Sequence, residues 1–206
     1  MGRARRGLVA GFMLLAVAAV LSGCYLPDKF RAEIRISRSG AFAVTYEGEL
    51  VYAPLYADIV QGKLSSQEAP EKIAVAERDL KRDSGFKSVK SLGNGRFSVS
   101  YEGTGAVGGR GFFTFIRRNA DILSIKSRDG AMVIRANALS AVDGQRLMQL
   151  GLGMAGEFRV TTDAPVREHN AAAVRSYAGY QIYIWQIDNP LSPSPRIVLE
   201  GPRVSG

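Results

Sequence analysis

The sequence predicts an α+β fold in which antiparallel β-hairpins form one or two curved sheets, with helices packed on a face. Three segments with alternating apolar residues around a glycine turn predict the hairpins, and two segments with helical periodicity predict the helices. Hydrophobic residues make up 46% of the chain, which is enough for one buried core. We therefore expect a single α+β domain over residues 24–188.

The first two hairpins resemble each other. Apolar residues alternate with charged ones over residues 30–36, Ser39-Gly40 follows, and alternation resumes. Phe42–Gly48 reads FAVTYEG, and Phe97–Gly103 reads FSVSYEG after an Asn94-Gly95 pair. Asn-Gly favours a type I′ turn because both central residues need positive φ. We interpret residues 30–48 and 86–103 as a duplicated hairpin; two similar strands that arose by chance are the alternative.

The remaining strands alternate less strictly, and the mixed phases of the third hairpin predict a strand partly buried on both sides. A third hairpin is predicted over residues 122–135, with its turn at Asp129-Gly130, and a short strand over residues 112–116 precedes it. Further strands are expected from Glu157 to Thr162 and from Tyr180 to Asp188.

Two segments have the periodicity of helices. The first runs from Pro54 to Leu80, with a loop near Ser65-Ser66, and the second from Ala138 to Leu150. Residues 189–206 contain four prolines, and proline cannot donate to a β-ladder, so this end is expected to be an extended tail. Deleting the tail should then scarcely affect folding.

The first 23 residues have the organisation of a secretory signal peptide. A head with Arg3, Arg5 and Arg6 precedes an apolar run over residues 8–21, shorter than the roughly 20 residues that a transmembrane helix needs. Residues 21–24, Leu-Ser-Gly-Cys, resemble the bacterial lipobox, which implies cleavage between Gly23 and Cys24 and diacylglycerol on the Cys24 sulfur. A free thiol behind an ordinary signal and a short transmembrane anchor are the alternatives.

The lipobox resemblance also implies a location. Cys24 is the only cysteine, so no disulfide competes for it, and the covalent lipid on Cys24 is the only prosthetic group expected. Tyr25 differs from the aspartate that retains such lipoproteins at the inner membrane of Gram-negative bacteria. The resemblance therefore favours lipid anchoring to the outer membrane, facing the periplasm.

The charge balance favours a membrane over a nucleic acid as partner. The chain has 27 basic and 19 acidic residues; residues 1–23 contain three arginines and no acid, so 24 and 19 remain, an excess of five. No groove-reading motif or cluster of cations among aromatic residues accompanies this mild excess, so no nucleic-acid partner is expected. A surface beside anionic lipid is compatible with it.

No sequence motif predicts catalysis or a metal site. Residues 103–108 and 151–156 match G-x-G-x-x-G, but neither stands between a strand and a following helix, the order that phosphate binding requires. His169 is the only histidine, in an expected polar loop over residues 167–170. We therefore predict no catalytic residues, no metal ligands and no enzymatic activity; a general base at His169 is the alternative.

The C-terminal half resembles a known family. Residues 157–166, EFRVTTDAPV, followed by Asn170, Gly179 and a strand from Tyr180 to Trp185, are similar to the signature of LppM-like bacterial lipoproteins. The resemblance covers about 30 residues and implies an envelope domain that handles lipids or glycolipids, with no catalytic residues to carry over.

These observations predict a membrane-anchored, non-catalytic envelope lipoprotein that binds a lipid-like or apolar ligand or an envelope-assembly partner. A purely structural or scaffolding lipoprotein is the second hypothesis, and an enzyme using the His169 loop is the third. An apolar cavity of several hundred Å³ would favour the first, and a packed core with an exposed edge would favour the second. The ligand-binding residues themselves are not predicted.

Overall fold

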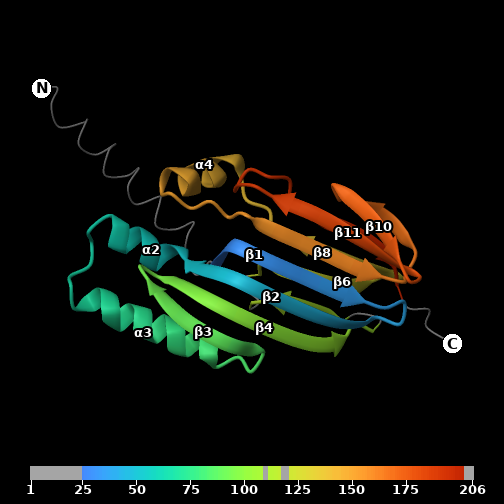
Figure 1. The fold of residues 1–206 in the computed structure, drawn as a ribbon, viewed down its shortest axis with the longest axis horizontal. Helices are drawn as coiled ribbons and strands as arrows, with labels where there is room; N and C mark the ends of the chain where they lie inside the picture. The colour runs from blue at the N-terminus through green and yellow to red at the C-terminus, as the bar shows by residue number, and fades with distance from the viewer. Residues whose placement is uncertain (1–24, 109–110, 117–120, 202–206) are drawn as a thin grey trace, which may run out of the picture.

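The computed structural model describes residues 25–108, 111–116 and 121–201, in which two β-sheets face each other (Figure 1). The signal peptide, Gly23 and Cys24 lie outside these residues. Sheet A has the order β10-β11-β8-β1-β2-β4-β3. Its strands are β1 (Tyr25–Ile36), β2 (Ala41–Tyr52), β3 (Phe86–Gly93), β4 (Arg96–Ala106), β8 (Gly156–Thr162), β10 (Ala173–Tyr177) and β11 (Tyr180–Ile187).

Sheet B is smaller and has the order β5-β6-β7-β12-β9. Its strands are β5 (Phe112–Phe115), β6 (Leu123–Arg128), β7 (Ala131–Ala136), β9 (Val166–His169) and β12 (Arg196–Glu200). Both sheets are built mainly from antiparallel hairpins, as predicted. The exception is β1, which pairs in parallel with β8, so that Ala32 lies beside Phe158.

The two similar hairpins lie side by side in sheet A. β2 pairs antiparallel with β4, and Tyr46 lies opposite Tyr101 at the centre of the pairing. Val44 lies opposite Gly103, and Gly48 lies opposite Val99. The two copies of the repeated sequence therefore run in opposite directions about a local twofold axis between the two tyrosines.

The Asn-Gly and Asp-Gly turns are confirmed. Asn94 and Gly95 have φ angles of 51° and 70°, and Asp129 and Gly130 have 52° and 70°. Positive φ at both central positions is what a two-residue turn needs to match the twist of the flanking strands. These two turns fix the registers of the β3–β4 and β6–β7 hairpins.

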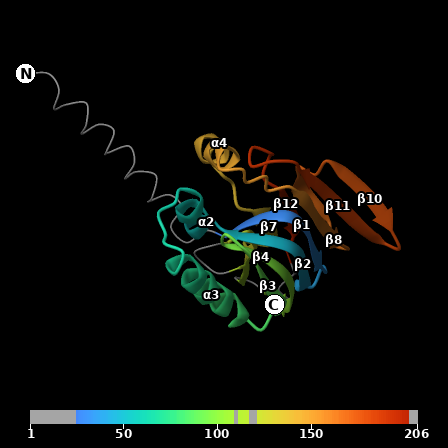
Figure 2. The same cartoon turned by 60° about the vertical axis from the view of Figure 1, so that its left-hand side comes forward.

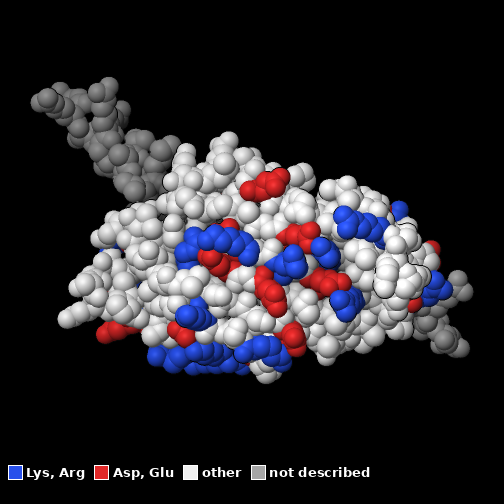
Figure 3. All heavy atoms as spheres, in the orientation of Figure 1, with Lys and Arg blue, Asp and Glu red and all other residues white. Residues whose placement is uncertain are grey.

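The core lies between the sheets and follows the predicted alternation. In β1, Ala32, Ile34 and Ile36 point inward and are buried, whereas Arg31 and Arg35 are exposed on the opposite face. Figure 3 shows that opposite face, over β1, β2 and β8, as a surface of interleaved basic and acidic side chains. Sheet A thus has one face packed against the core and one face exposed to solvent.

In the described part of the chain, three helices complete the fold: α2 (Ala53–Val60), α3 (Glu68–Lys81) and α4 (Ala141–Gln149). Pro54 lies in the first turn of α2, and the Ser140 side chain caps α4 by accepting a hydrogen bond from the Asp143 N–H. α3 adds Ala76 and Leu80 to the main core. α2 and α4 contribute to a second, smaller buried cluster beside the start of β1: Leu26, Val51, Ala53, Leu147 and Leu152.

The predicted extended tail is wrong for residues 196–200. These residues form β12, which lies between β7 and β9 and pairs antiparallel with both. Ile197 and Leu199 are fully buried, and Val198 is nearly so. Pro190, Pro193 and Pro195 precede the strand, so its N–H groups are free to pair.

The predicted polar loop around His169 is also a strand for most of its length. Val166–His169 form β9 at the edge of sheet B, and a further strand, β10, follows at the edge of sheet A. All five residues of β10 are exposed, so its sequence lacks the alternation of a half-buried strand. Figures 1 and 2 show β10 beside β11, on the side of the molecule away from α2 and α3.

Candidate functional site

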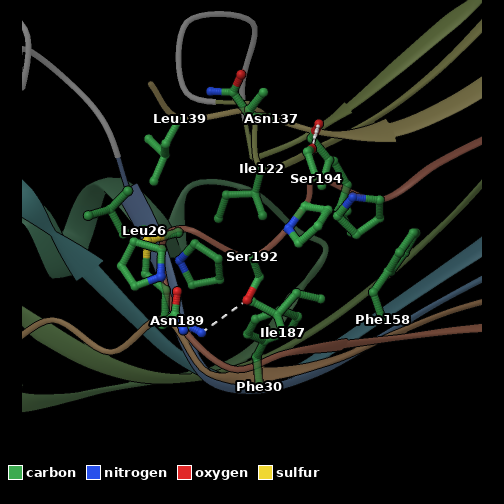
Figure 4. A pocket seen from close by; sticks show the side chains of 18 of the residues that line it. Leu26, Phe30, Ile122, Asn137, Leu139, Phe158, Ile187, Asn189, Ser192 and Ser194 are labelled. Atoms are coloured by element: carbon green, nitrogen blue, oxygen red, sulfur yellow. Dashed lines mark hydrogen bonds between the residues drawn. The ribbon is translucent and has the colours of Figure 1, made fainter. Parts of the chain in front are cut away.

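A cavity of about 530 Å³ opens between the two sheets where β1 begins. Its walls come from the start of β1, the connection between β7 and α4, the first turns of α4, and the loop between β11 and β12 (Figure 4). This volume lies within the range of small-molecule sites, about 300–1,000 Å³. Most of the lining side chains are apolar.

Two small side chains, one on each of the facing sheets, leave this space. On sheet A, neighbouring Ala32, Tyr46 and Phe158 line the cavity; on sheet B, the paired Leu123 and Ala136 do so. We call these five residues the cavity row. Two of them are alanines, one on each sheet, so the side chains reach only part of the way across.

The next row of side chains along the same strands leaves no such space. It comprises the neighbouring Ile34, Val44 and Val160 of sheet A and Ile125, Ile134 and Ile197 of sheet B. We call these six residues the packed row. All are branched and fully buried, and none lines the cavity. The core therefore closes within two residues of the cavity along each strand.

A proline-rich loop forms the outer wall. Pro190, Pro193 and Pro195 line the cavity, and hydrogen bonds within the loop hold its shape. The Ser192 hydroxyl accepts from the N–H groups of Asp188 and Asn189, at 3.1 and 3.2 Å, and the Ser194 hydroxyl donates to the Ala136 carbonyl at 2.8 Å. These polar groups thus form hydrogen bonds with other residues of the cavity wall, as Figure 4 shows.

The cavity carries little charge. Among the described residues that line it, none is Lys or Arg, and Asp121 is the only acid. Tyr46 is fully buried, and its hydroxyl donates to the Glu49 carbonyl at 2.7 Å. Burial raises the pKa of Tyr46 well above its usual value, so this phenol stays neutral. An uncharged, apolar ligand surface is the chemistry that this lining accepts.

A buried ionic cluster holds the strand that enters the cavity. Arg96 bridges Asp28 and Glu49, with Nη2 2.6 Å from Asp28 Oδ2 and 2.5 Å from Glu49 Oε2. Asp28 Oδ1 also accepts a hydrogen bond from the Ala155 N–H at 3.2 Å. Burial opposes ionisation of Glu49, but hydrogen bonds from Arg96 and Lys29 lower its pKa overall. The cluster fixes the start of β1 against β2, β4 and the segment before β8.

The residues singled out by the sequence fall elsewhere. Gly23 and Cys24 lie outside the described part of the chain. His169 is exposed on β9 and does not line the cavity; its Nδ1 accepts from the Ala171 N–H at 3.2 Å, and its ring packs edge-on against Tyr183. Within the described ranges, no three His, Cys, Asp or Glu residues are grouped to hold a metal, and no helix is long and apolar enough to cross a bilayer.

Two residues of the C-terminal resemblance have structural roles. Trp185 is buried, stacks on Phe158, and donates from Nε1 to Asn170 Oδ1 at 2.8 Å. The same Asn170 oxygen accepts from the Arg196 N–H at 2.8 Å, so Asn170 joins sheet A to β12 of sheet B. Neither residue lines the cavity.

Sequence reasoning missed the cavity residues. One available signal was the concentration of small residues and prolines: Ala136, Ala138 and Ala141 around the start of α4, and three prolines after β11. Small residues and prolines do not by themselves define a site. Their significance depends on the two sheets facing each other, which the pattern within one strand does not reveal.

Comparisons with solved structures give a distant similarity in fold. No family model matches the chain, and no curated protein matches it. The fold resembles the NMR structure of the folded domain of LppM from Mycobacterium tuberculosis, with 10% identity and a TM-score of 0.43, over 87% of this chain and 93% of that one.

Proposed function

We propose that this protein is a membrane-anchored envelope lipoprotein whose domain holds an acyl chain in the cavity between its sheets. The observation that carries the proposal is the cavity itself: about 530 Å³, mainly apolar, and lined in part by exposed residues of α4 and of the proline-rich loop. The lipobox-like ending at Cys24 supports the anchor, and the lack of a recognisable catalytic motif in the sequence supports a binding role.

The volume favours one chain. A water molecule occupies about 30 Å³ of liquid, and a methylene group is of similar size, so the cavity has room for roughly 18 such groups. That number matches one long acyl chain. Each buried methylene contributes about 0.8 kcal/mol, so a single chain can bind firmly in a preformed cavity.

The test uses residues 25–206 without the anchor and a fluorescent sixteen-carbon fatty acid as probe. Replacing Ala136 with leucine extends a side chain from sheet B into the cavity and should weaken probe binding by about tenfold or more. The same replacement should raise the melting temperature, because filling an apolar void adds contacts. Fluorescence titration and thermal unfolding measure the two effects.

Ala43→Leu is the matched control. Ala43 also lies in a strand, but it is on the outer face of sheet A, between Arg35 and Thr104. This variant should bind the probe as the unmodified domain does. Equal binding by the unmodified domain and the Ala136→Leu variant, or no binding by either, would reject the cavity as a lipid site.

The anchor is tested separately with the full chain. Cys24→Ala should abolish incorporation of radiolabelled palmitate and release a soluble or unprocessed form, because the thiol is the expected site of attachment. Continued acyl labelling of this variant would reject Cys24 as the lipidated residue. Fractionation of the two membranes tests the proposed outer-membrane location.

A scaffolding role is the second candidate, and the edge strand β10 favours it. β10 is fully exposed, and its hairpin with β11 displays Val174, Tyr177 and Tyr180, with Tyr177 75% exposed. An unpaired strand edge can accept another strand. Cross-linking from Tyr177 in cells would identify an envelope-protein partner, and its absence together with probe binding would leave the lipid role.

A further inference from the structure

The fold begins directly beside the expected anchor. β1 starts at Tyr25, and Tyr25, Leu26 and Pro27 all line the cavity. An extended residue spans at most about 3.6 Å, so no spacer separates Cys24 from the domain. A lipid on Cys24 would therefore hold the start of β1, and with it the cavity, close to the membrane surface.

The same end of the molecule exposes apolar side chains. Val142 and Met148 of α4 are 56% and 47% exposed. Leu191, 46% exposed, comes from the loop between β11 and β12 and packs on α4, with Cδ2 2.6 Å from where a Cβ at Gly144 would lie. We call the exposed surface of α4 together with Leu191 the α4 face.

The α4 face is also poor in charge. On α4, the only charged residues are Asp143 and Arg146, which pair with each other at 3.6 Å. Figure 3 shows the area over α4 as nearly free of charge, in contrast to the surface over β1 and β2. Removing water from the α4 face therefore desolvates few ions, while it buries apolar side chains.

The α4 face borders the opening of the cavity. Ala141 and Gln145 are exposed on α4 and also line the cavity, and Leu191 does so from the facing loop. Whatever surface covers the α4 face therefore also meets the cavity opening.

We propose that the α4 face rests on the membrane that carries the Cys24 lipid, so that the cavity opens directly onto the acyl chains of that leaflet. β1 begins at Tyr25, the residue after the expected anchor, so the anchor brings the membrane to this end of the domain. We therefore infer that a bilayer, rather than a protein, covers the α4 face. This inference rests on the proposed function for what enters the cavity, but the docking itself is measured independently of binding.

The test places a fluorophore on the lipidated full-length protein in vesicles of phosphatidylcholine with a minor fraction of phosphatidylglycerol. Cys24 is the only native cysteine, and lipidation blocks it, so an introduced cysteine is the only free thiol. Met148→Cys puts the label on the α4 face. Thr104→Cys puts it on β4, opposite Ala43 on the outer face of sheet A, and is the matched control.

Nitroxide-bearing lipids should quench the label at position 148 several-fold more strongly than the label at position 104. The double change Val142→Glu and Met148→Glu should slow transfer of a fluorescent lipid from vesicles into the anchored protein several-fold. It should leave fatty-acid binding by residues 25–206 unchanged, because both side chains are exposed and neither lines the cavity.

The outcomes separate the two proposals. Equal quenching at both positions would overturn docking through the α4 face, even if residues 25–206 bind the fatty acid. Selective quenching at position 148 would support docking even if the cavity binds no lipid, which would reject only the proposed function. A mature protein without acyl mass on Cys24 would overturn the docking, because nothing would then hold this end at the membrane.

Discussion

The packed row and the cavity row belong to the same strands, yet one closes the core and the other leaves it open. In β1 the difference lies between Ile34 and Ala32, and in β7 between Ile134 and Ala136. The backbone pairing is continuous through both rows. The size of the side chains in the two rows therefore determines where the cavity lies. The loop between β11 and β12 forms its outer wall, because the prolines of this loop cannot extend the sheet.

The largest expected effect comes from removing β12, which lies between β7 and β9 in sheet B and carries Ile197 of the packed row. A chain that ends after Pro195 lacks β12 and three buried residues, Ile197, Val198 and Leu199. Each buried aliphatic side chain contributes about 1.5–3 kcal/mol, and whole domains are stable by only about 5–15 kcal/mol. The truncated protein should lack a cooperative thermal transition in circular dichroism. A transition like that of the intact domain would show that β12 is dispensable.

The next effect compares the packed row with a side chain that borders the cavity. Ile34→Ala in the packed row should lower the free energy of unfolding by about 3 kcal/mol, because its neighbours cannot close the void. Ile187→Ala beside the cavity should cost about 1 kcal/mol, because Ile187 is half-buried and already borders space. Urea unfolding measures both. Similar losses would mean that the cavity side is packed as tightly as the rest.

A further effect, smaller than that of Ile34→Ala, concerns the charges that hold the start of β1. Arg96→Leu should lower the free energy of unfolding at pH 7 by about 2–3 kcal/mol, because it leaves Asp28 and Glu49 buried without their shared partner. Arg35→Leu is the control: this arginine is largely exposed in its pair with Glu33, so the loss should stay below about 1 kcal/mol.

The Arg96 effect should depend on pH. The pKa of Glu49 is lowered in the folded state, so its contribution to stability is fully present above the unfolded value of about 4.3 and is lost as the pH falls through the lower folded value. The difference between the unmodified protein and Arg96→Leu should therefore be largest above about pH 5 and shrink below about pH 4. A difference that stays constant across this range in urea unfolding would contradict the ionic role.

Alternation and turn chemistry were sufficient to predict the hairpins. Residues 30–36 and the Asn94-Gly95 turn have the conformations that their sequence favours, because each pattern reports on its own strand. β10 and β12 were missed for opposite reasons. β10 is exposed on both faces and β12 is buried on both, so neither alternates, and β12 pairs with strands far away in sequence. The cavity depends on which rows of two sheets face each other, and no local pattern carries that information.

The parallel pairing of β1 with β8 bears on the order of folding. Residue 32 of the first strand lies beside residue 158, so the centre of sheet A joins segments separated by most of the chain. Closing so long a loop lowers the conformational entropy of the chain before the stabilising contacts between β1 and β8 form. Chains rich in such long-range pairings fold slowly. The hairpin of β1 and β2 forms locally, but its other edge stays unpaired until β8 is present. We expect this protein to reach its native state only after nearly the whole chain is available, and to expose an apolar strand edge until then.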